Sequence, residues 1–311
     1  MTKKSVSSAH VIVAVAPSDV GFMRLGAETE AICAEAGLPQ TSPVRLLGSE
    51  HKWTAVEINV DLGDADLTRT RMHLSAAVSH RFDIALIPAT HRRKRLLISD
   101  MDSTIIEQEC LDELAAYAGL KDEIAAITAR AMAGELDFEA ALTERVGRLK
   151  GLSLQALEQC YGERITLMPG ARTLTATMTA HGAHCLLVSG GFTYFTERVA
   201  KAAGFHAHHG NTLIDNGKTL TGEVKHPILG RQAKLDALNQ AANAQKITLE
   251  NTIAMGDGAN DLAMIEAAGL GLAVHAKPVV ATAADAAINR TDLTAALYYQ
   301  GYTDSEIIWK D

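Results

Sequence analysis

Two carboxylates separated by a single residue follow a short apolar run in the first half of the chain. Leu96–Ile98 has the composition of a buried strand, and Asp100 and Asp102 come directly after its end. Because ligands of α/β folds bind just beyond the carboxyl ends of parallel strands, these two acids are expected where chemistry is usually done. At this spacing they can address one centre, as a nucleophile, a general acid/base or a metal ligand.

Two other interpretations of this pair are weaker. A calcium-binding loop that starts at Asp100 needs Gly at its sixth position and Glu at its twelfth, where the sequence has Ile105 and Leu111. A helix cap at Ser103 or Thr104 leaves two acids after a buried strand without explanation. The pattern therefore favours phosphoryl transfer, which also requires partners elsewhere in the chain.

Two glycine-containing turns are candidates for these partners. Ser189-Gly190-Gly191 follows an apolar run, but the G-x-S-x-G pattern of a serine nucleophile is absent because Leu187 replaces the first Gly. A hydroxyl and unobstructed N–H groups at this place predict a phosphate cradle instead. Gly256-Asp257-Gly258 departs from a dinucleotide fingerprint at Asp261, where Gly is required. Its carboxylates are better explained as a metal ligand and a supporting group, because Mg²⁺ prefers few carboxylates together with phosphate oxygens.

Two basic side chains are candidates for anion binding. Lys234 could be an ordinary surface lysine, although a phosphate site needs such a charge. Arg145 shares a helix face with Phe138 and Leu142, so it could extend to solvent or face an enclosed carboxylate. The three histidines at 206–209 have no Cys or carboxylate partner in register, which favours a surface hairpin over a zinc site.

The elements around these motifs indicate an α/β domain that is interrupted by a helical insertion. Residues 107 to about 168 are rich in Ala and predict helices near 107–118, 121–133, 137–149 and 153–162. We expect this insertion to form an all-helical cap. After a break at 168–170, a hairpin is expected at 211–222 and strands at 184–188, 251–255, 271–274 and 286–288. With intervening helices, this order predicts a doubly wound parallel sheet.

Residues 10–90 form a unit of their own, which is followed by the basic run His91–Arg95. Helix patterns at 22–36 and 64–78 alternate with strand patterns at 10–16, 42–48, 52–60 and 81–87. The order βαββαβ predicts an α+β domain, a four-stranded sheet with helices on one face. This order and the turn Asp19-Val20-Gly21 resemble the ACT module, which senses amino acids; a dimerisation or packing role is the competing interpretation. The basic run predicts a solvated connector rather than a nucleic-acid site.

Composition limits the remaining possibilities. A chain of 311 residues suits two domains, which we place at 1–90 and 91–311. The net charge of −8 argues against a nucleic-acid partner. The four cysteines contain no C-x-x-C pair, as expected of free thiols in a reducing compartment. Neither a signal-peptide core nor an 18-residue apolar run is present, so we expect a cytoplasmic protein without a membrane partner.

Taken together, the motifs resemble the haloacid dehalogenase superfamily from residue 95 to about 295. The matching segments are D-x-D-S-T at 100–104, S-G-G-F at 189–192, a downstream Lys and G-D-G-x-N-D at 256–261. Residues of the cap resemble the branch of that superfamily that acts on phosphoserine. They are Glu109, Met132, Asp137-Phe138-Glu139 and Arg145-Val146.

The resemblance implies a role for each matching position in the core. Asp100 would attack phosphorus and form an aspartyl-phosphate, while Asp102 would protonate the leaving oxygen and then activate water. Mg²⁺ would be held by Asp100, the main-chain carbonyl of Asp102 and Asp257, with Asp261 behind them. The groups that would hold the phosphoryl oxygens are Ser189, Gly190 and Lys234, with Asn260 nearby.

The resemblance also implies that the cap selects the substrate. Arg145 would pair with a carboxylate and Glu109 with an ammonium group, while Phe138 and Met132 would exclude water. We therefore expect a homodimer that hydrolyses O-phospho-L-serine to L-serine and phosphate, the last step of serine synthesis. A phosphotransferase that passes the phosphoryl group to an acceptor such as homoserine is one alternative. A non-catalytic amino-acid sensor is another, although the intact acids and Lys234 argue against it.

Overall fold

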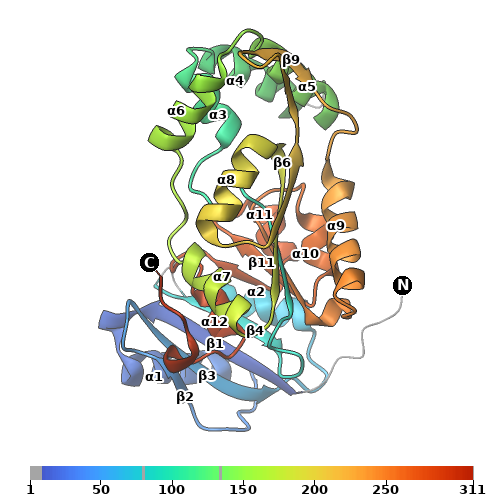
Figure 1. The fold of residues 1–311 in the computed structure, drawn as a ribbon. Helices are drawn as coiled ribbons and strands as arrows, with labels where there is room; N and C mark the ends of the chain where they lie inside the picture. Colours follow the sequence, from blue (N-terminus) through green and yellow to red (C-terminus); the bar gives the residue numbers. More distant parts are fainter. Residues whose placement is uncertain (1–8, 79–80, 133–134, 311) are drawn as a thin grey trace.

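The N-terminal unit is an antiparallel sheet with two helices on one face (Figure 1). The computed structural model describes residues 9–78, 81–132 and 135–310, including the side chains of all of these except residues 131 and 132. The sheet has the order β2-β3-β1-β4, and its strands are β1 (Ala9–Pro17), β2 (Arg45–Gly48), β3 (Trp53–Asp61) and β4 (Asp83–Pro88). The helices are α1 (Phe22–Glu35) and α2 (Leu67–Ala77). The expected element order βαββαβ is confirmed.

The strand β1 lies between two hydrophobic cores because its alternate side chains point to opposite faces of the sheet. Ile12 and Ala14 pack in the core beneath α1 and α2. Val11 and Val13 pack on the other side, in the core that also contains α12 (Ala295–Tyr299). Both faces of this sheet are therefore buried, and the C-terminal segment that covers the second face was not predicted from the sequence.

The second unit is built on a parallel sheet that is covered by helices on both faces, as expected for a doubly wound fold. Its order is β12-β11-β10-β5-β6-β7, and its strands are β5 (Leu96–Ser99), β6 (His184–Phe192), β7 (Ala207–Asn211), β10 (Thr252–Gly256), β11 (Leu270–Val274) and β12 (Ala286–Ile288). One face packs against α7 (Ala171–Ala180), α8 (Thr193–Ala203) and α12. The other packs against α9 (Arg231–Ala244), α10 (Leu262–Ala267) and α11 (Pro278–Ala283).

The two sheets are joined into one. Strand β4 pairs antiparallel with β12 at Ala85 and Ala286, which makes a sheet of ten strands within the described residues. The sequence predicts a sheet in each of two domains but does not predict this join. The join forms because β4 and β12 are both edge strands of their own sheets and offer unpaired backbone groups to each other.

Within its described residues, the cap contains four helices, as predicted, and a β-hairpin that was not assigned to it. The helices are α3 (Cys110–Tyr117), α4 (Lys121–Met132), α5 (Phe138–Arg148) and α6 (Leu154–Arg164). The hairpin of β8 (Leu213–Asp215) and β9 (Leu220–Val224) reaches up to them in Figure 1. Backbone hydrogen bonds join Gly151 and Leu152 to Leu220, whose side chain is buried in the core. The expectation of an all-helical cap is therefore wrong, because the hairpin supplies apolar side chains that complete the core of the cap.

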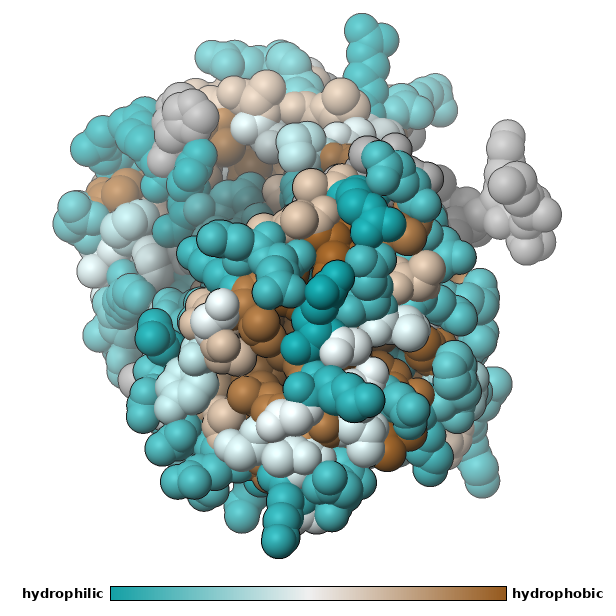
Figure 2. All heavy atoms as spheres, turned by 90° about the horizontal axis from the view of Figure 1, so that it is seen from above, coloured by the Kyte–Doolittle hydropathy of each residue, from teal (hydrophilic) through white to brown (hydrophobic). Residues whose placement is uncertain are grey.

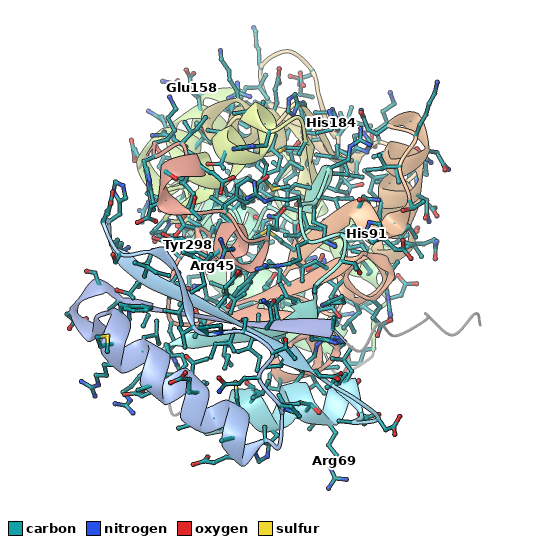
Figure 3. The ribbon with its side chains drawn as sticks, turned by 90° about the horizontal axis from the view of Figure 1, so that it is seen from below. Arg45, Arg69, His91, Glu158, His184 and Tyr298 are labelled. Carbon is teal, nitrogen blue, oxygen red and sulfur yellow. The ribbon has the colours of Figure 1, made fainter. Side chains whose placement is uncertain are left out.

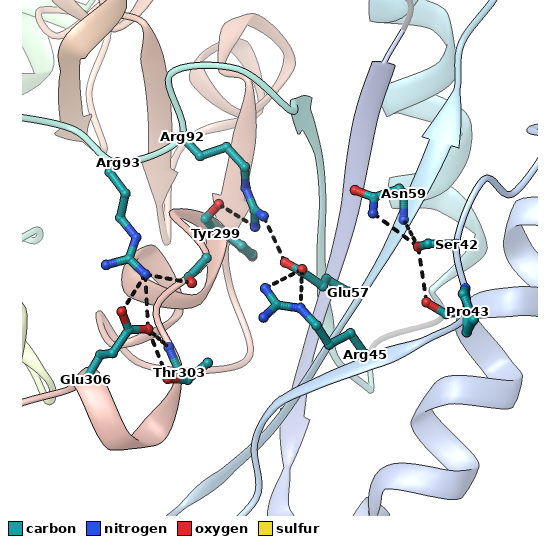
Figure 4. A network of polar contacts seen from close by, with 11 residues as sticks. Ser42, Pro43, Arg45, Glu57, Asn59, Arg92, Arg93, Tyr299, Thr303 and Glu306 are labelled. Atoms are coloured by element: carbon teal, nitrogen blue, oxygen red, sulfur yellow. Dashed lines mark hydrogen bonds and ion pairs between the residues drawn. The ribbon is translucent and has the colours of Figure 1, made fainter.

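The basic run after β4 is docked in part: Arg92 and Lys94 are partly or fully buried, while His91, Arg93 and Arg95 are exposed, as expected of a solvated connector. Arg92 contacts Glu57 of β3 at 2.8 Å, and Arg93 contacts Glu306 near the C-terminus at 2.9 Å (Figure 4). Lys94 is buried and donates to the main-chain carbonyl of Glu250 at 2.8 Å. The docking of Arg92 and Lys94 was not predicted, because their partners Glu57 and Glu250 lie far away in the sequence.

The surface seen from the cap end is mixed in character. Hydrophobic residues gather toward the middle of this face, and hydrophilic residues surround them (Figure 2). Among the described residues, no helix has both the length and the apolar character that crossing a bilayer requires.

Candidate active site

The three predicted turns meet at one edge of the sheet because β10, β5 and β6 are neighbours and run parallel. Asp100 and Asp102 follow β5, Ser189 and Gly190 lie near the end of β6, and Asp257 follows β10. All five line one cavity of about 180 Å³. The expectation that the strand ends bring these residues together is confirmed in geometry.

The side chain of Asp100 is buried and fixed through one of its oxygens. Its Oδ1 accepts a hydrogen bond from the N–H of Met101 at 2.8 Å and lies 2.8 Å from Nζ of Lys234. Lys234 comes from α9, is 2% exposed, and also contacts Asp261 at 2.6 Å. Burial disfavours the charge of this lysine, but the two carboxylates more than offset that effect and raise its pKa.

Asp102 is oriented by two donors and is poised to hold a proton. Its Oδ1 accepts from the N–H of Cys110 at 2.8 Å, and its Oδ2 accepts from the hydroxyl of Ser189 at 2.9 Å. Burial, followed by the charges of Glu109 and Asp100, raises the pKa of Asp102 to about 7. A Cβ at Gly191 would stand 3.0 Å from this Oδ2, so Gly at that position keeps the access to the acid open.

Asp257 and Asp261 complete a group of acids that could hold a cation. Carboxylate oxygens of Asp100, Asp257 and Asp261 lie within 4.8 Å of one another. Burial and the charge of Asp100 raise the pKa of Asp257 to about 6, as expected where carboxylates face one another without sufficient positive charge. An all-oxygen donor set of this kind fits a hard cation such as Mg²⁺. Asp261 already accepts from Lys234 and from the N–H of Gly258, so Asp257 is the freer ligand.

The cap contributes one cation and one acid to the same cavity. Arg145 of α5 lines it, and burial lowers the pKa of its guanidinium while Asp112 and Glu109 oppose this shift. Glu109 precedes α3, accepts from the hydroxyl of Ser103 at 2.7 Å, and has its pKa raised by burial. The structure therefore places Arg145 on the enclosed face of α5, which decides between the two orientations that the sequence left open.

Three other predicted residues are placed differently with respect to the cavity. Phe138 lines it from the cap and packs on Gly190, where an added Cβ would stand 3.2 Å from the ring. Asn260 lines it from the turn after β10. Met132 is the last residue of α4, and its side chain lies outside the described residues.

Lys277 also lines the cavity and was not predicted from the sequence. It follows β11, the neighbour of β10, and its N–H donates to the main-chain carbonyl of Asp257 at 3.2 Å. The one signal that could have found it is its place after a parallel strand next to the acidic turn.

Comparisons with known proteins agree with this geometry. The model of the haloacid dehalogenase-like hydrolases matches residues 97–266. Phosphoserine phosphatases of Archaeoglobus fulgidus and Vibrio cholerae are 43% and 41% identical over 77% and 76% of this chain, and the alignments span 70% and 72% of those relatives. The phosphoserine phosphatase of Streptomyces coelicolor is 43% identical, and the alignment covers 82% of this chain and 62% of that protein.

Solved structures show the same relationship. A haloacid dehalogenase family hydrolase from Salmonella enterica serovar Typhi superimposes with a TM-score of 0.83 over 94% of this chain and 98% of its own, at 29% identity. A substrate-bound phosphoserine phosphatase superimposes with a TM-score of 0.62 over 67% of this chain and 98% of its own, at 37% identity. The chain therefore belongs to the haloacid dehalogenase-like hydrolases and, within them, to the family of the phosphoserine phosphatases. It is a phosphatase that acts on a small-molecule substrate.

Proposed function

We propose that the protein hydrolyses O-phospho-L-serine to L-serine and phosphate, the last step of L-serine biosynthesis, with Mg²⁺ as its cofactor. The observation that carries this proposal is the composition of one small cavity. Its floor holds the acids of the phosphoryl-transfer site, and its roof holds Arg145 and Glu109. A zwitterionic amino acid needs one fixed charge of each sign, and the cap supplies that pair. The names and similarity of the relatives support the same substrate.

In this proposal Asp100 is the nucleophile. Met101 N–H and Lys234 both contact its Oδ1, so we assign the attack on phosphorus to Oδ2. Attack breaks the bond between phosphorus and the serine oxygen and forms an aspartyl-phosphate. Water then cleaves that acyl phosphate, which regenerates the carboxylate and releases phosphate.

Asp102 acts as the general acid and base. Because its pKa is raised to about 7, it can carry a proton near neutral pH and give it to the departing serine oxygen. It then accepts a proton from the attacking water. The hydrogen bonds from Cys110 and Ser189 hold its carboxyl group in place during both steps.

The residues that would hold Mg²⁺ are Asp100, Asp257 and the main-chain carbonyl of Asp102, with Asp261 behind them. When bound, the ion shields the negative charges of the nucleophile and the phosphate from each other. Lys234 contacts Asp100 and is itself held by Asp261, so these two residues fix the position of the Asp100 carboxylate.

The remaining residues bind the substrate. Ser189, Gly190, Lys234 and Asn260 are assigned to the phosphoryl oxygens, Arg145 to the carboxylate and Glu109 to the ammonium group. Phe138, packed on Gly190, separates the site from solvent, and Met132 is assigned to the same task.

The test is phosphate release from O-phospho-L-serine, with Mg²⁺ and with a chelator, against a panel of other phosphomonoesters. We expect Mg²⁺-dependent turnover with a strong preference for phosphoserine and with water as the sole acceptor. Turnover of other esters but not of phosphoserine would retain the chemistry and reject the roles of Arg145 and Glu109. Turnover only in the presence of a second hydroxyl compound would indicate a phosphotransferase, and no turnover would indicate a sensor.

The proposal includes an ACT-like N-terminal domain at residues 1–90, a catalytic domain at 91–311, and a homodimer. A half-exposed Leu46 on the edge strand β2 supports an association through this unit. Light scattering during gel filtration tests the dimer. A cytoplasmic location is also part of the proposal, because all four cysteines are free thiols.

A further inference from the structure

Lys277 lies in the segment between β11 and α11 and lines the catalytic cavity. The residue lines the cavity together with Asp100, Asp102 and Asp257, and it is the residue that precedes α11. Its main-chain N–H bonds to the carbonyl of Asp257, so its backbone is tied to the acidic turn. Its side chain therefore starts from a fixed point beside the phosphoryl-transfer site.

Three cationic side chains belong to the site, and they differ in what they already contact. Lys234 is 2% exposed and is held between two carboxylates at 2.8 and 2.6 Å. Arg145 belongs to the cap and donates to the main-chain carbonyl of Ala141 at 3.2 Å. Lys277 is exposed, and within the described part of the chain its ammonium group has neither an ion pair nor a hydrogen bond. It is thus the cation of the core that remains available to an incoming ligand.

The charge balance of the cavity makes such a cation useful. Asp100, Asp102, Glu109 and Asp257 all line the cavity, and a phosphomonoester dianion that approaches them is repelled. The field of Lys277 reaches one of these acids, because its charge opposes the rise in the pKa of Asp257. A lysine has a flexible four-carbon stem and three donors, so it can follow a phosphate group from the rim inward.

We propose that Lys277 is a further substrate-binding residue, which attracts the phosphate dianion at the rim of the cavity and contacts it in the bound state. This proposal rests on the proposed function only in requiring a phosphomonoester as substrate. The competing explanation is that Lys277 acts solely on Asp257 and, through it, on the metal ion. The two differ in whether the substrate's charge and the salt concentration matter.

The test compares Lys277→Gln and Lys277→Arg with a matched control, Lys201→Gln. Lys201 is an exposed lysine near the end of α8 that does not line the cavity. Each variant is assayed at saturating Mg²⁺ with phosphoserine and with an aryl phosphate, at about 20 mM and about 500 mM salt, where screening differs strongly. Inhibition by inorganic phosphate is measured in parallel as a binding readout.

For Lys277→Gln we expect kcat/KM to fall roughly 10- to 100-fold at low salt, mainly through KM, because steering by one charge acts on association. The difference should shrink at high salt, inorganic phosphate should inhibit less, and Lys277→Arg should retain most of the activity. Lys201→Gln should match the unmodified protein. Because the side chain of Lys277 is exposed, we expect an unchanged melting temperature.

Several results would overturn the proposal. One is a kcat/KM within about twofold of the unmodified protein at low salt. Others are equal losses in Lys277→Arg and Lys277→Gln, or an altered Mg²⁺ dependence with unchanged inhibition by phosphate. If the unmodified protein turns over the aryl phosphate but not phosphoserine, the proposed function fails, while Lys277 can still be tested on the aryl ester.

Discussion

The catalytic cavity and the contact between the two halves of the molecule use charged side chains in opposite ways. In the cavity, carboxylates face one another, and the pKa of Asp102 rises to about 7 and that of Asp257 to about 6. At the contact, three acids are paired with arginines. The pairs are Glu57 with Arg92 at 2.8 Å, Asp285 with Arg71 at 2.6 Å, and Glu306 with Arg93 at 2.9 Å.

The charged residues at the contact stabilise the fold, whereas those in the cavity are available for proton transfer and cation binding. Partial burial of Glu306 works against its charge, but hydrogen bonds from Thr303 and Arg93 lower its pKa to about 2. That carboxylate stays ionised and holds the C-terminal segment in place. Among the described residues, Asp102 and Asp257 of the cavity form no ion pair, so Asp102 can exchange a proton near neutral pH and Asp257 can bind a cation.

The largest effect that this comparison predicts is that of Asp100→Asn. Loss of the nucleophile should lower kcat by at least about 10³-fold, because no covalent intermediate can form. The fold should survive, since Lys234 keeps its contact with Asp261. Phosphate release and the melting temperature are the measurements, and normal turnover would remove Asp100 from its assigned role.

The next effect is that of Arg145→Ala on substrate choice. We expect kcat/KM for phosphoserine to fall roughly 100-fold or more, because a charge-assisted pair with the substrate carboxylate is lost. An aryl phosphate lacks that carboxylate and should be affected far less. Equal losses on the two substrates would show that Arg145 does not recognise the amino-acid part.

A smaller effect concerns how stability depends on pH in the metal-free protein. A carboxyl whose folded pKa is raised binds protons more tightly when folded, so Asp102 and Asp257 should lower the stability as pH rises from about 4 to about 7. Glu306 acts in the opposite direction, and its contribution should be lost as pH falls from about 4.5 to about 2. Melting temperatures with chelator across this range are the measurement.

Two variants separate these contributions. Asp102→Asn should raise the melting temperature at pH 8 by about 3 °C or more and leave it unchanged at pH 4. Glu306→Gln should reduce the loss of stability in acid and leave the values at neutral pH lower than in the unmodified protein. If the melting temperature of the unmodified protein does not change between pH 4 and pH 8, the pKa values of Asp102 and Asp257 are not raised in the folded state.

The smallest effect is that of Arg71→Ala. Arg71 pairs with Asp285 just after α11 and also donates to the carbonyl of Leu86. We expect a fall in melting temperature of about 2–4 °C and a kcat/KM within about twofold. Arg69→Ala is the matched control, because Arg69 points from α2 into solvent (Figure 3). A large loss of activity in Arg71→Ala would mean that the ion pair with Asp285 also fixes the position of α11 and, with it, of Lys277.

Much of the fold and site could be predicted because the signals were local. Alternating and helical patterns placed the elements of the N-terminal unit and the helices of the cap within a few residues. The acids and glycines of the site stood at predicted strand ends, and parallel order then required them to meet. The orientation of Arg145 could not be predicted, because it depends on which face of α5 packs toward the cavity.

The parts that could not be predicted depend on partners that are distant in the sequence. The pairing of β4 with β12 leaves no pattern in either strand, since each is short and apolar. The helix α12 has five residues, too few for a periodic signal. Arg92 and Lys277 were missed because an exposed or solvated position is the usual place for a basic residue, and only the fold brings acids to them.

The burial of β1 against the last segment has a consequence for how the chain folds during synthesis. Residues near 88 leave the ribosome roughly 10–45 s before those near 309, at about 5–20 residues per second. During that interval the nascent N-terminal sheet exposes the face that carries Val11 and Val13. This apolar face stays exposed until the C-terminal segment has been synthesised and packs on it. We therefore expect the nascent chain to bind chaperones during that interval.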